Sequence, residues 1–320
     1  MNRKILIASC KYDESTWDPV AQVLRKRGHK VVSIETDSIA NGSKSFTMQV
    51  ADKTPLITYC GEQIDLASFD AAWYRRPTLF GYLEPNAVRQ HTLAREVNAL
   101  QHVLWEMVPE KAWLNTIDAM QHAERKITQL SIARSLGFKT PQTIVTNQWS
   151  QIKKSLPQEV IIKSSYGVLD AGADVKLLYT QPFKTSSLPT DHSPYPGIWQ
   201  ERLTDKQKEW RITIVDGKVF SAAVYTDPDA KDDWRRLQDT NKVRFVAETF
   251  PDEQIQKCLA YMDHFRLRFG AFDFVEDSKG NIVFLECNTN GQYGWLEHEL
   301  GFPITQAVAD LLESIALRTL

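Results

Sequence analysis

The 320-residue sequence is short of cysteine, of net charge and of long apolar runs. Its four cysteines are far apart and lack the paired spacing of a metal site, so we expect free thiols in a reducing cytoplasm. The formal charge of -2 gives no general attraction to nucleic acid or to an anionic membrane. No apolar run is long enough to span a bilayer, and the N-terminus resembles a first strand more than a signal peptide. These features favour a soluble, cytoplasmic enzyme.

Internal repeats and low-complexity segments are also missing, and the composition of 42% hydrophobic and 24% charged residues is ordinary for a globular protein. The first residues alternate strand and helix: apolar runs at 4–8 and 31–34 flank a helical pattern over 16–28. This order predicts a small α/β layer with a parallel pair of strands. A long helix over 86–107 follows, and an irregular connection suggests a domain boundary near residue 115.

The second half of the chain alternates helices with hairpins. Helical patterns are expected over 118–136, which places Lys126 near the middle of a helix, and over 254–269 and 303–317. Strands are expected over 160–163 and 197–203, with a surface loop over 181–197. Residues 209–225 read as a hairpin around Asp216-Gly217.

A second hairpin, residues 269–291, carries two carboxylates in otherwise apolar strands. If Lys279-Gly280 form a two-residue turn, Asp273 and Glu286 lie directly opposite each other, where like charges repel. Asn288 falls on the same face, because strand side chains repeat every second residue. Oxygen donors of this kind suit a hard cation, with Mg²⁺ and a nucleotide phosphate as the usual occupants. The alternative is a solvated hairpin face that happens to hold two acids.

Several basic residues stand where a solvated charge is not the simplest explanation. Lys163 follows three apolar β-branched residues, so its ammonium group either reaches the surface or meets an anion. Trp73-Tyr-Arg-Arg-Pro77 resembles a strand that ends in two arginines. Arg75 and Arg76 can grip a carboxylate or phosphate, or they can pair with acids in a domain interface. The residues alone leave both alternatives open.

Two separated lysines, a Gln-Glu pair, a hairpin arginine and the Asp/Glu/Asn face follow one another in the order that ATP chemistry on a carboxylate needs. From about Lys126 to the C-terminus the chain resembles the ATP-grasp superfamily of carboxylate-activating ligases. The resemblance is most specific where Phe284-Leu-Glu-Cys-Asn-Thr-Asn-Gly-Gln292 follows Asp273 at hairpin distance. With the Trp-Tyr-Arg-Arg-Pro element, Trp199-Gln-Glu201, Glu209-Trp-Arg211 and Asn290-Gly-Gln-Tyr-Gly-Trp295, most of the chain resembles the peptide-maturing ATP-grasp ligases of the microviridin, or graspetide, type.

The resemblance implies an α/β (α+β) ATP-grasp fold in three parts: a pre-ATP-grasp α/β domain over 1–115, a central domain over 116–200 and a C-terminal antiparallel-sheet domain over 201–320. It also implies a role for each matching residue. Lys126 and Lys163 would contact ATP phosphates, Gln200 and Glu201 would form the adenine side, and Glu209 would lie near the nucleotide. Arg211 would stabilise an acyl phosphate, Arg235 would touch the transferred phosphate or the substrate carboxylate, and Asp273, Glu286 and Asn288 would bind two Mg²⁺ ions. The loop after Lys163 lacks the dense glycines of many members, which leaves its closure over the phosphates open.

The implied reaction activates Asp or Glu side chains of a ribosomal precursor peptide, leader plus core, and joins them to Ser/Thr as lactones or to Lys as lactams. A homodimer is a reasonable assembly by the same resemblance, and neither nucleic acid nor membrane is an expected partner. Two alternatives remain at this point. A ligase of the same chemistry would join a free amino acid or small amine to a carboxylate, and a nucleotide-binding module would lack catalysis altogether.

Overall fold

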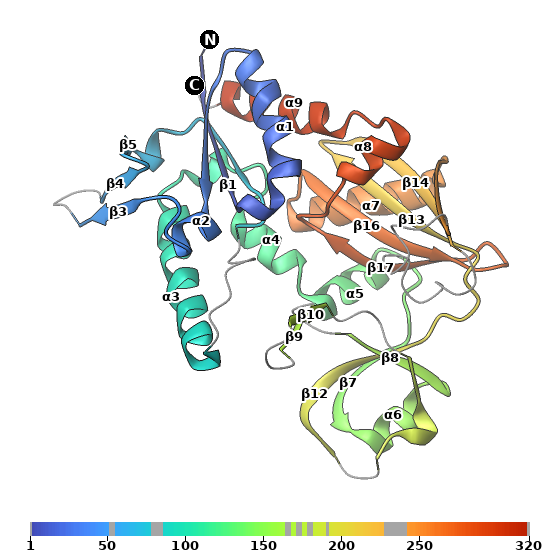
Figure 1. Cartoon of the computed structure of the whole chain (residues 1–320). Coiled ribbons are helices and arrows are strands. Elements are labelled where there is room, and N and C mark those ends of the chain that lie inside the picture. Colours follow the sequence, from blue (N-terminus) through green and yellow to red (C-terminus); the bar gives the residue numbers. More distant parts are fainter. Residues whose placement is uncertain are drawn as a thin grey trace.

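The computed structural model describes residues 2–50, 55–77, 86–163, 168–170, 175–177, 182–189, 192–226 and 242–318. Within these ranges the strands form five sheets (Figure 1). A parallel sheet and its helices make the N-terminal part, a small antiparallel sheet makes the central part, and a larger antiparallel sheet makes the C-terminal part. Arg235 lies outside the described residues. Residues 167, 171 and 172 of the loop that follows Lys163 also lie outside them.

The N-terminal part is built on a three-stranded parallel sheet of order β2-β1-β6. Leu6 of the central strand lies beside Val32 on one side and Ala72 on the other, which confirms the predicted parallel pair. The strand β1 is apolar because helices cover both faces of the sheet. The elements of this part are β1 (Lys4–Ser9), η1 (Lys11–Asp13), α1 (Glu14–Lys26), β2 (Lys30–Glu35), α2 (Thr36–Ala40), β3 (Phe46–Gln49), β4 (Leu56–Tyr59), β5 (Glu62–Ile64), η2 (Leu66–Ser68), β6 (Ala71–Tyr74), α3 (Ala87–Glu106) and η3 (Glu110–Ala112).

The C-terminal part has a five-stranded antiparallel sheet of order β15-β14-β13-β16-β17. One of its faces buries an aromatic-rich core that includes Phe272, Phe274 and Phe284, all fully buried. The opposite face carries Glu209, Arg211 and Asp273, because strand side chains alternate. The elements of this part are β13 (Lys208–Val215), β14 (Lys218–Thr226), β15 (Val243–Ala247), α7 (Asp252–Phe265), β16 (Phe269–Glu276), β17 (Ile282–Asn288), α8 (Gly294–Leu300) and α9 (Ile304–Arg318).

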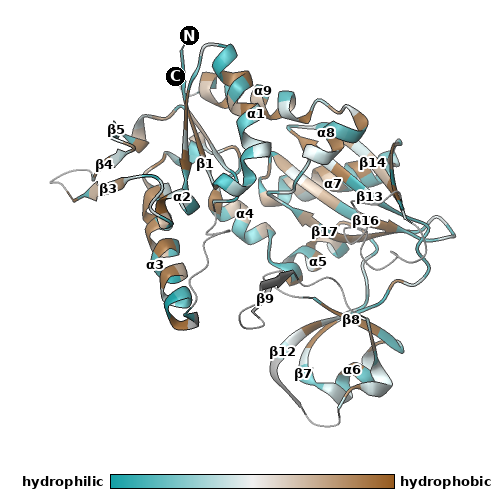
Figure 2. Ribbon diagram, in the orientation of Figure 1, coloured by the Kyte–Doolittle hydropathy of each residue, from teal (hydrophilic) through white to brown (hydrophobic). Residues whose placement is uncertain are grey.

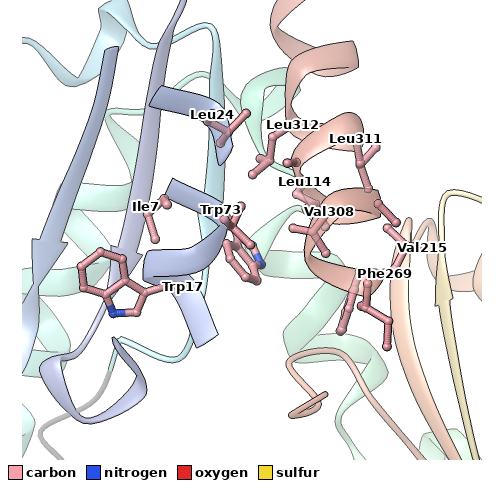
Figure 3. Close-up of a cluster of buried hydrophobic side chains, with 14 of the residues drawn as sticks. Ile7, Trp17, Leu24, Trp73, Leu114, Val215, Phe269, Val308, Leu311 and Leu312 are labelled. Carbon is pink, nitrogen blue, oxygen red and sulfur yellow. The ribbon is translucent and has the colours of Figure 1, made fainter. Parts of the chain in front are cut away.

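The last helix, α9, packs between the N-terminal part and the C-terminal part of the chain. Figure 3 shows Val308, Leu311 and Leu312 of this helix between the N-terminal sheet and the C-terminal strands. Figure 2 shows hydrophobic residues alternating along α9 with hydrophilic ones, as expected for a helix with one buried side. Arg27 adds an ion pair with Asp310, 2.6 Å away. The predicted helix over 303–317 is confirmed, within one residue at each end.

The central part is a four-stranded antiparallel sheet of order β11-β8-β12-β7. It contains β7 (Thr143–Gln148), α6 (Trp149–Ser155), β8 (Glu159–Lys163), β11 (Pro182–Lys184), η4 (Thr185–Ser187) and β12 (His192–Glu201), with a separate pair formed by β9 (Val168–Asp170) and β10 (Val175–Leu177). The prediction of a simple loop over 181–197 was wrong, because β11 and the first half of β12 lie there. Two prolines in β12 obscured the strand, and its register with β7 is irregular between His192 and Gly197.

The predicted helix over 118–136 is two helices, α4 (Ile117–Ala123) and α5 (Lys126–Ser135). The apolar periodicity continues across the break because both helices pack on the same core, through Met120 and Ala123 before it and Leu130 and Ala133 after it. Lys126 is therefore the first residue of α5 and not a mid-helix residue. Among the described residues no helix is long and apolar enough to cross a membrane.

The hairpin between β16 and β17 has a different turn from the predicted one. The loop spans residues 277–281, and Glu276 pairs with Ile282, so a two-residue turn at Lys279-Gly280 is wrong. A register shift between Asp273 and Phe274 then moves the pairing by one residue. The irregularity restores the predicted pairing of Asp273 with Glu286.

Candidate active site

A row of charged side chains crosses three neighbouring strands of the C-terminal sheet. Asp273 on β16 lies opposite Glu286 on β17 and opposite Arg211 on β13. The Arg211 guanidinium donates to the Asp273 carboxylate over 3.0 Å. Each acid thus has a like charge on one side, and the arginine offsets part of the repulsion.

Asn288 closes this row, on the same face as Glu286. Its amide nitrogen donates to Asp273 Oδ2 over 3.1 Å and to Glu286 Oε1 over 3.3 Å. Three oxygen-bearing side chains therefore converge on one point, and turning the amide would present its oxygen there. The described residues contain no group of three or more His, Cys, Asp and Glu side chains that could hold a metal. A metal bound by Asp273 and Glu286 would therefore need another kind of third ligand, and Asn288 is a candidate. One or two carboxylates completed by phosphate oxygens is a set that Mg²⁺ accepts, and these residues fit it.

Lys126 at the start of α5 reaches the same carboxylates. Its ammonium group lies 2.8 Å from Glu286 Oε2. Burial alone would raise the pKa of the Glu286 carboxyl, but the Lys126 and Lys163 charges outweigh burial and lower that pKa to about 2. Glu286 is therefore ionised at neutral pH and available to a cation.

A small pocket lies between the central sheet and β17. Its lining combines two cations, two amides, an acid and three apolar side chains: Lys126, Gln129, Leu130, Lys163, Ile198, Gln200, Leu285 and Glu286. Lys163 stands at the end of β8, opposite Ile198 of β12. The two predicted phosphate lysines thus come together from different parts of the chain and face one cavity.

The side chains of Gln200 and Glu201 lie on opposite faces of β12. Gln200 lines the pocket and donates to Thr143 Oγ1 over 3.0 Å. The Glu201 carboxylate instead accepts from the Gln142 backbone N–H over 2.9 Å, at the start of β7. The alternation of strand side chains separates the two residues, so only Gln200 lines the pocket.

Glu209 and Arg211 share the polar face of β13. Glu209 pairs with the buried ammonium group of Lys206. Arg211 Nε is buried and has no hydrogen-bond partner among the described residues. A buried guanidinium nitrogen without a partner is costly, and an anionic ligand such as a phosphate oxygen would satisfy it.

Arg75 and Arg76 take different positions. Arg75 is fully buried, with Nε 2.6 Å from Asp13 Oδ2 and Nη1 2.8 Å from the Asn290 carbonyl oxygen. These contacts favour the interface pair over the substrate contact for Arg75. Arg76 has a positive φ of 50°, its side chain is 39% exposed, and Nη1 lies 3.8 Å from Asp13 Oδ1. Arg76 stays a candidate for substrate binding.

Sequence reasoning missed three residues that support the site. Gln129 both accepts from the Cys287 N–H and donates to the Cys287 carbonyl, at 2.9 and 3.1 Å, between Glu286 and Asn288. Glu124 accepts from the Thr289 hydroxyl, directly after Asn288. Lys206 pairs with Glu209. The only sequence signal was the Lys126–Gln129 spacing of three, which puts both residues on one side of a helix.

Comparisons with known proteins bear on the fold that holds these residues. Residues 4–121 match the MvdD pre-ATP-grasp domain. The whole fold is similar to macrocyclase MdnB from Microcystis aeruginosa MRC, with 27% sequence identity, a TM-score of 0.74, and coverage of 97% of this chain and 99% of that chain. The chain has the ATP-grasp fold.

This ATP-grasp chain is also similar to macrocyclase MdnC of the same organism, bound with precursor peptide MdnA: TM-score 0.78, 23% identity, 97% of this chain and 99% of that chain. ATP-grasp ligase PsnB, complexed with a phosphomimetic variant of a minimal precursor, Mg and ADP, matches at TM-score 0.72 and 21% identity over 98% and 99% of the two chains. A search of curated proteins finds no match. The matches confirm the predicted fold class and the predicted resemblance to peptide-maturing ATP-grasp ligases.

Proposed function

We propose that the protein activates Asp or Glu side chains of a ribosomal precursor peptide as acyl phosphates and closes lactone or lactam rings. The observation that carries this proposal is the convergence of Asp273, Glu286 and Asn288 with Lys126 and Arg211 beside the pocket. The metal-ligand set alone would suit many reactions. Its combination with the Lys126 and Lys163 ammonium groups and the Arg211 guanidinium suits the transfer of a phosphoryl group to a carboxylate.

In this proposal Lys126 and Lys163 hold the phosphates of ATP, and Gln200 with the adjoining β12 backbone meets the adenine. The substrate carboxylate attacks the γ-phosphate, ADP leaves, and Arg211 stabilises charge on the transferred group. Asp273, Glu286 and Asn288 would hold Mg²⁺, which would supply positive charge beside the phosphates. A hydroxyl or amine of the same peptide then attacks the acyl phosphate and expels phosphate.

No described residue stands out as the general base for that second attack. Burial raises the pKa of the Cys287 thiol well above its ordinary value, so this thiol between two metal ligands stays protonated and is not a nucleophile. Holding the nucleophile next to the acyl phosphate can supply much of the rate.

Several finer features belong to the same proposal. They are two Mg²⁺ ions, the three domains at 1–115, 116–200 and 201–320, a role for Glu209 beside the nucleotide, a homodimer, and a cytoplasmic location. The Mg and ADP in the PsnB complex support the metal and the nucleotide. The precursor peptide in the MdnC complex supports a peptide substrate.

The test is the mass of a candidate precursor peptide after incubation with the protein, ATP and Mg²⁺. The peptide to try first is short, rich in Ser, Thr, Lys, Asp and Glu, and encoded beside the gene. We expect one water to be lost for each ring and one ADP to be formed. A gain of a residue mass would instead identify a ligase for a free amino acid or small amine. Failure to form ADP with any such peptide would favour a binding module.

Glu286→Gln provides the internal control, because it removes one charge from the metal-ligand set with little change in shape. We expect at least an approximately 100-fold loss of ADP formation with the fold intact. The matched variant is Glu276→Gln, on the same hairpin. Glu276 accepts from the Trp210 indole N–H over 2.7 Å, a contact that a glutamine oxygen can keep. Full activity in Glu286→Gln would reject the metal assignment.

A further inference from the structure

Arg75 grips the turn that begins at a metal ligand. The Gly291 N–H donates to the Asn288 carbonyl over 3.2 Å, which closes a four-residue turn from Asn288 to Gly291. Arg75 Nη1 donates to the carbonyls of Asn290 and Gly291, at 2.8 and 3.2 Å. The last two residues of this turn are therefore tied to the N-terminal sheet, more than 200 residues away in the chain.

Asp13 fixes the guanidinium in place. Its carboxylate accepts from Arg75 Nε at 2.6 Å and Nη2 at 3.3 Å, and its Oδ1 also accepts from the Gln292 amide at 3.3 Å. Both members of the pair are buried, at 0% and 2% side-chain exposure. A planar fork that serves one carboxylate and two carbonyls at once is a geometry that lysine cannot reproduce.

The sheet holds the other side of the same turn. A Cβ on Gly291 would lie 2.4 Å from the Ala271 Cβ, far inside van der Waals contact. Ala271 lies directly opposite Asn288 in the β16–β17 pairing. The turn is thus confined between Arg75 on one side and Ala271 on the other, and Gly291 is the residue that permits the close approach.

A buried ion pair is weak evidence for a role in stability, because the cost of desolvation offsets much of the attraction between the charges. We infer that Arg75 is a positioning residue: with Asp13 and Gly291, it sets the Asn288–Gly291 turn and so aims the Asn288 side chain at the metal between Asp273 and Glu286. This inference rests on the proposed metal site. It makes the N-terminal domain part of the metal-binding apparatus.

The test measures metal binding directly, with Mn²⁺ as a paramagnetic probe titrated into the full-length protein in the presence of ADP. Arg75→Met should weaken Mn²⁺ binding about 10- to 100-fold, as expected when a ligand loses its support. Arg75→Lys should restore little of it, because an ammonium group cannot hold the fork of contacts. Urea unfolding of each variant measures stability alongside.

Arg27→Met is the matched control. Arg27 also joins the N-terminal part to the C-terminal part, through Asp310 at 2.6 Å and Glu313 at 2.8 Å, but these two partners lie on α9 and not in the turn. We expect Arg27→Met to lower stability and to leave Mn²⁺ affinity within about twofold of wild type, since affinity should respond only to the ligand's own support. Equal weakening by both variants would overturn the positioning role, because any loosening of the interface would then suffice.

Gly291→Ala tests the turn from the other side, should Arg75→Met fail to fold. We expect weaker Mn²⁺ binding with Arg75 intact, whereas Gly294→Ala, whose Cβ would meet nothing within 4 Å, should bind as wild type does. If Arg75→Met or Gly291→Ala bound Mn²⁺ with wild-type affinity, the positioning role of Arg75 would be overturned and the metal site would stand. A wild-type protein that binds no Mn²⁺ would overturn the metal site itself, and with it the proposed function.

Discussion

The two sheets that meet at the candidate active site differ in how they are supported. Among the residues that the structure describes, the C-terminal sheet carries Asp273, Glu286 and Asn288 over a core of nineteen buried residues, which also takes in α4, α5 and α7. The central sheet carries Lys163 and Gln200 over a core with five described buried residues: Ile152, Leu156, Val160, Leu188 and Trp199. Burial of apolar area is the main source of stability, so the metal face rests on the stronger support.

The difference in core size indicates different roles for the two sheets. A metal site gains from ligands that are held in place before the metal arrives, and the large core provides that. A sheet with a small core opens at lower free energy, and a ligand that bridges it to a stable neighbour stabilises it most. We therefore expect nucleotide binding to change the central sheet more than the C-terminal sheet.

Core truncations should separate the sheets most clearly. Phe272→Ala, at a fully buried position beside Asp273, should cost about 3–5 kcal/mol of global stability. Ile152→Ala, also fully buried, should act mainly on the central sheet and speed amide exchange in β7, β8 and β12. Urea unfolding and hydrogen exchange measure the two effects. If Ile152→Ala speeds exchange equally in β16, the sheets form one cooperative unit and the comparison fails.

Bound nucleotide should reduce the difference in stability between the central sheet and the C-terminal sheet. Mg·ADP at about 100 times its dissociation constant should stabilise the protein by about 2.7 kcal/mol. The added protection from amide exchange should concentrate in β8 and β12, because Lys163, Ile198 and Gln200 line the pocket from these strands. ADP without a divalent metal serves as the control. Equal protection of all strands would contradict a special dependence of the central sheet on ligand.

Lys163→Met should weaken nucleotide binding by removing one charged contact to phosphate, an effect of about 1.5–3 kcal/mol. The expected result is a higher KM for ATP in a protein that still folds, because the long apolar stem of lysine is replaced by another unbranched chain. Lys153→Met is the matched variant: its ammonium group donates to the Leu188 carbonyl over 2.9 Å, away from the lining of the pocket. Similar KM values in both variants would remove Lys163 from the phosphate site.

The sequence predicted the parts of this site that depend on local pattern. Alternation along a strand was enough to put Asn288 on the face of Glu286, and the hairpin was enough to pair Glu286 with Asp273. That pairing was predicted through the wrong turn, and an irregularity in the ladder restored the count. The predicted pairing is right because the different turn and the register shift offset each other. No pattern in the sequence predicts either of these two deviations.

The rest of the site depends on contacts between distant segments. Arg75 left two hypotheses open because nothing near residue 75 shows that Asp13 and the Asn290 carbonyl will surround it. The Gln129 contacts with Cys287 were invisible for the same reason, since 158 residues separate the partners. The sequence did not predict the break between α4 and α5 at Glu124–Arg125, because both helices pack on one core and the apolar periodicity continues across the break.

A last prediction concerns pH, and it tests whether Lys126 of α5 and Lys163 of the central sheet hold the Glu286 carboxylate ionised. The folded-state pKa of Glu286 lies at about 2, below its ordinary value of 4.5. A lowered folded-state pKa contributes stability above the unfolded-state value, and this contribution is lost as pH falls from about 4.5 towards 2. The stability difference between wild type and Glu286→Gln should therefore stay constant from about pH 7 to pH 5 and shrink only below pH 4.5. Other carboxylates titrate in both proteins, so the difference between two urea-unfolding series isolates Glu286. A difference that already shrinks between pH 7 and pH 6 would mean that Lys126 and Lys163 do not hold the carboxylate charged, and that burial dominates instead.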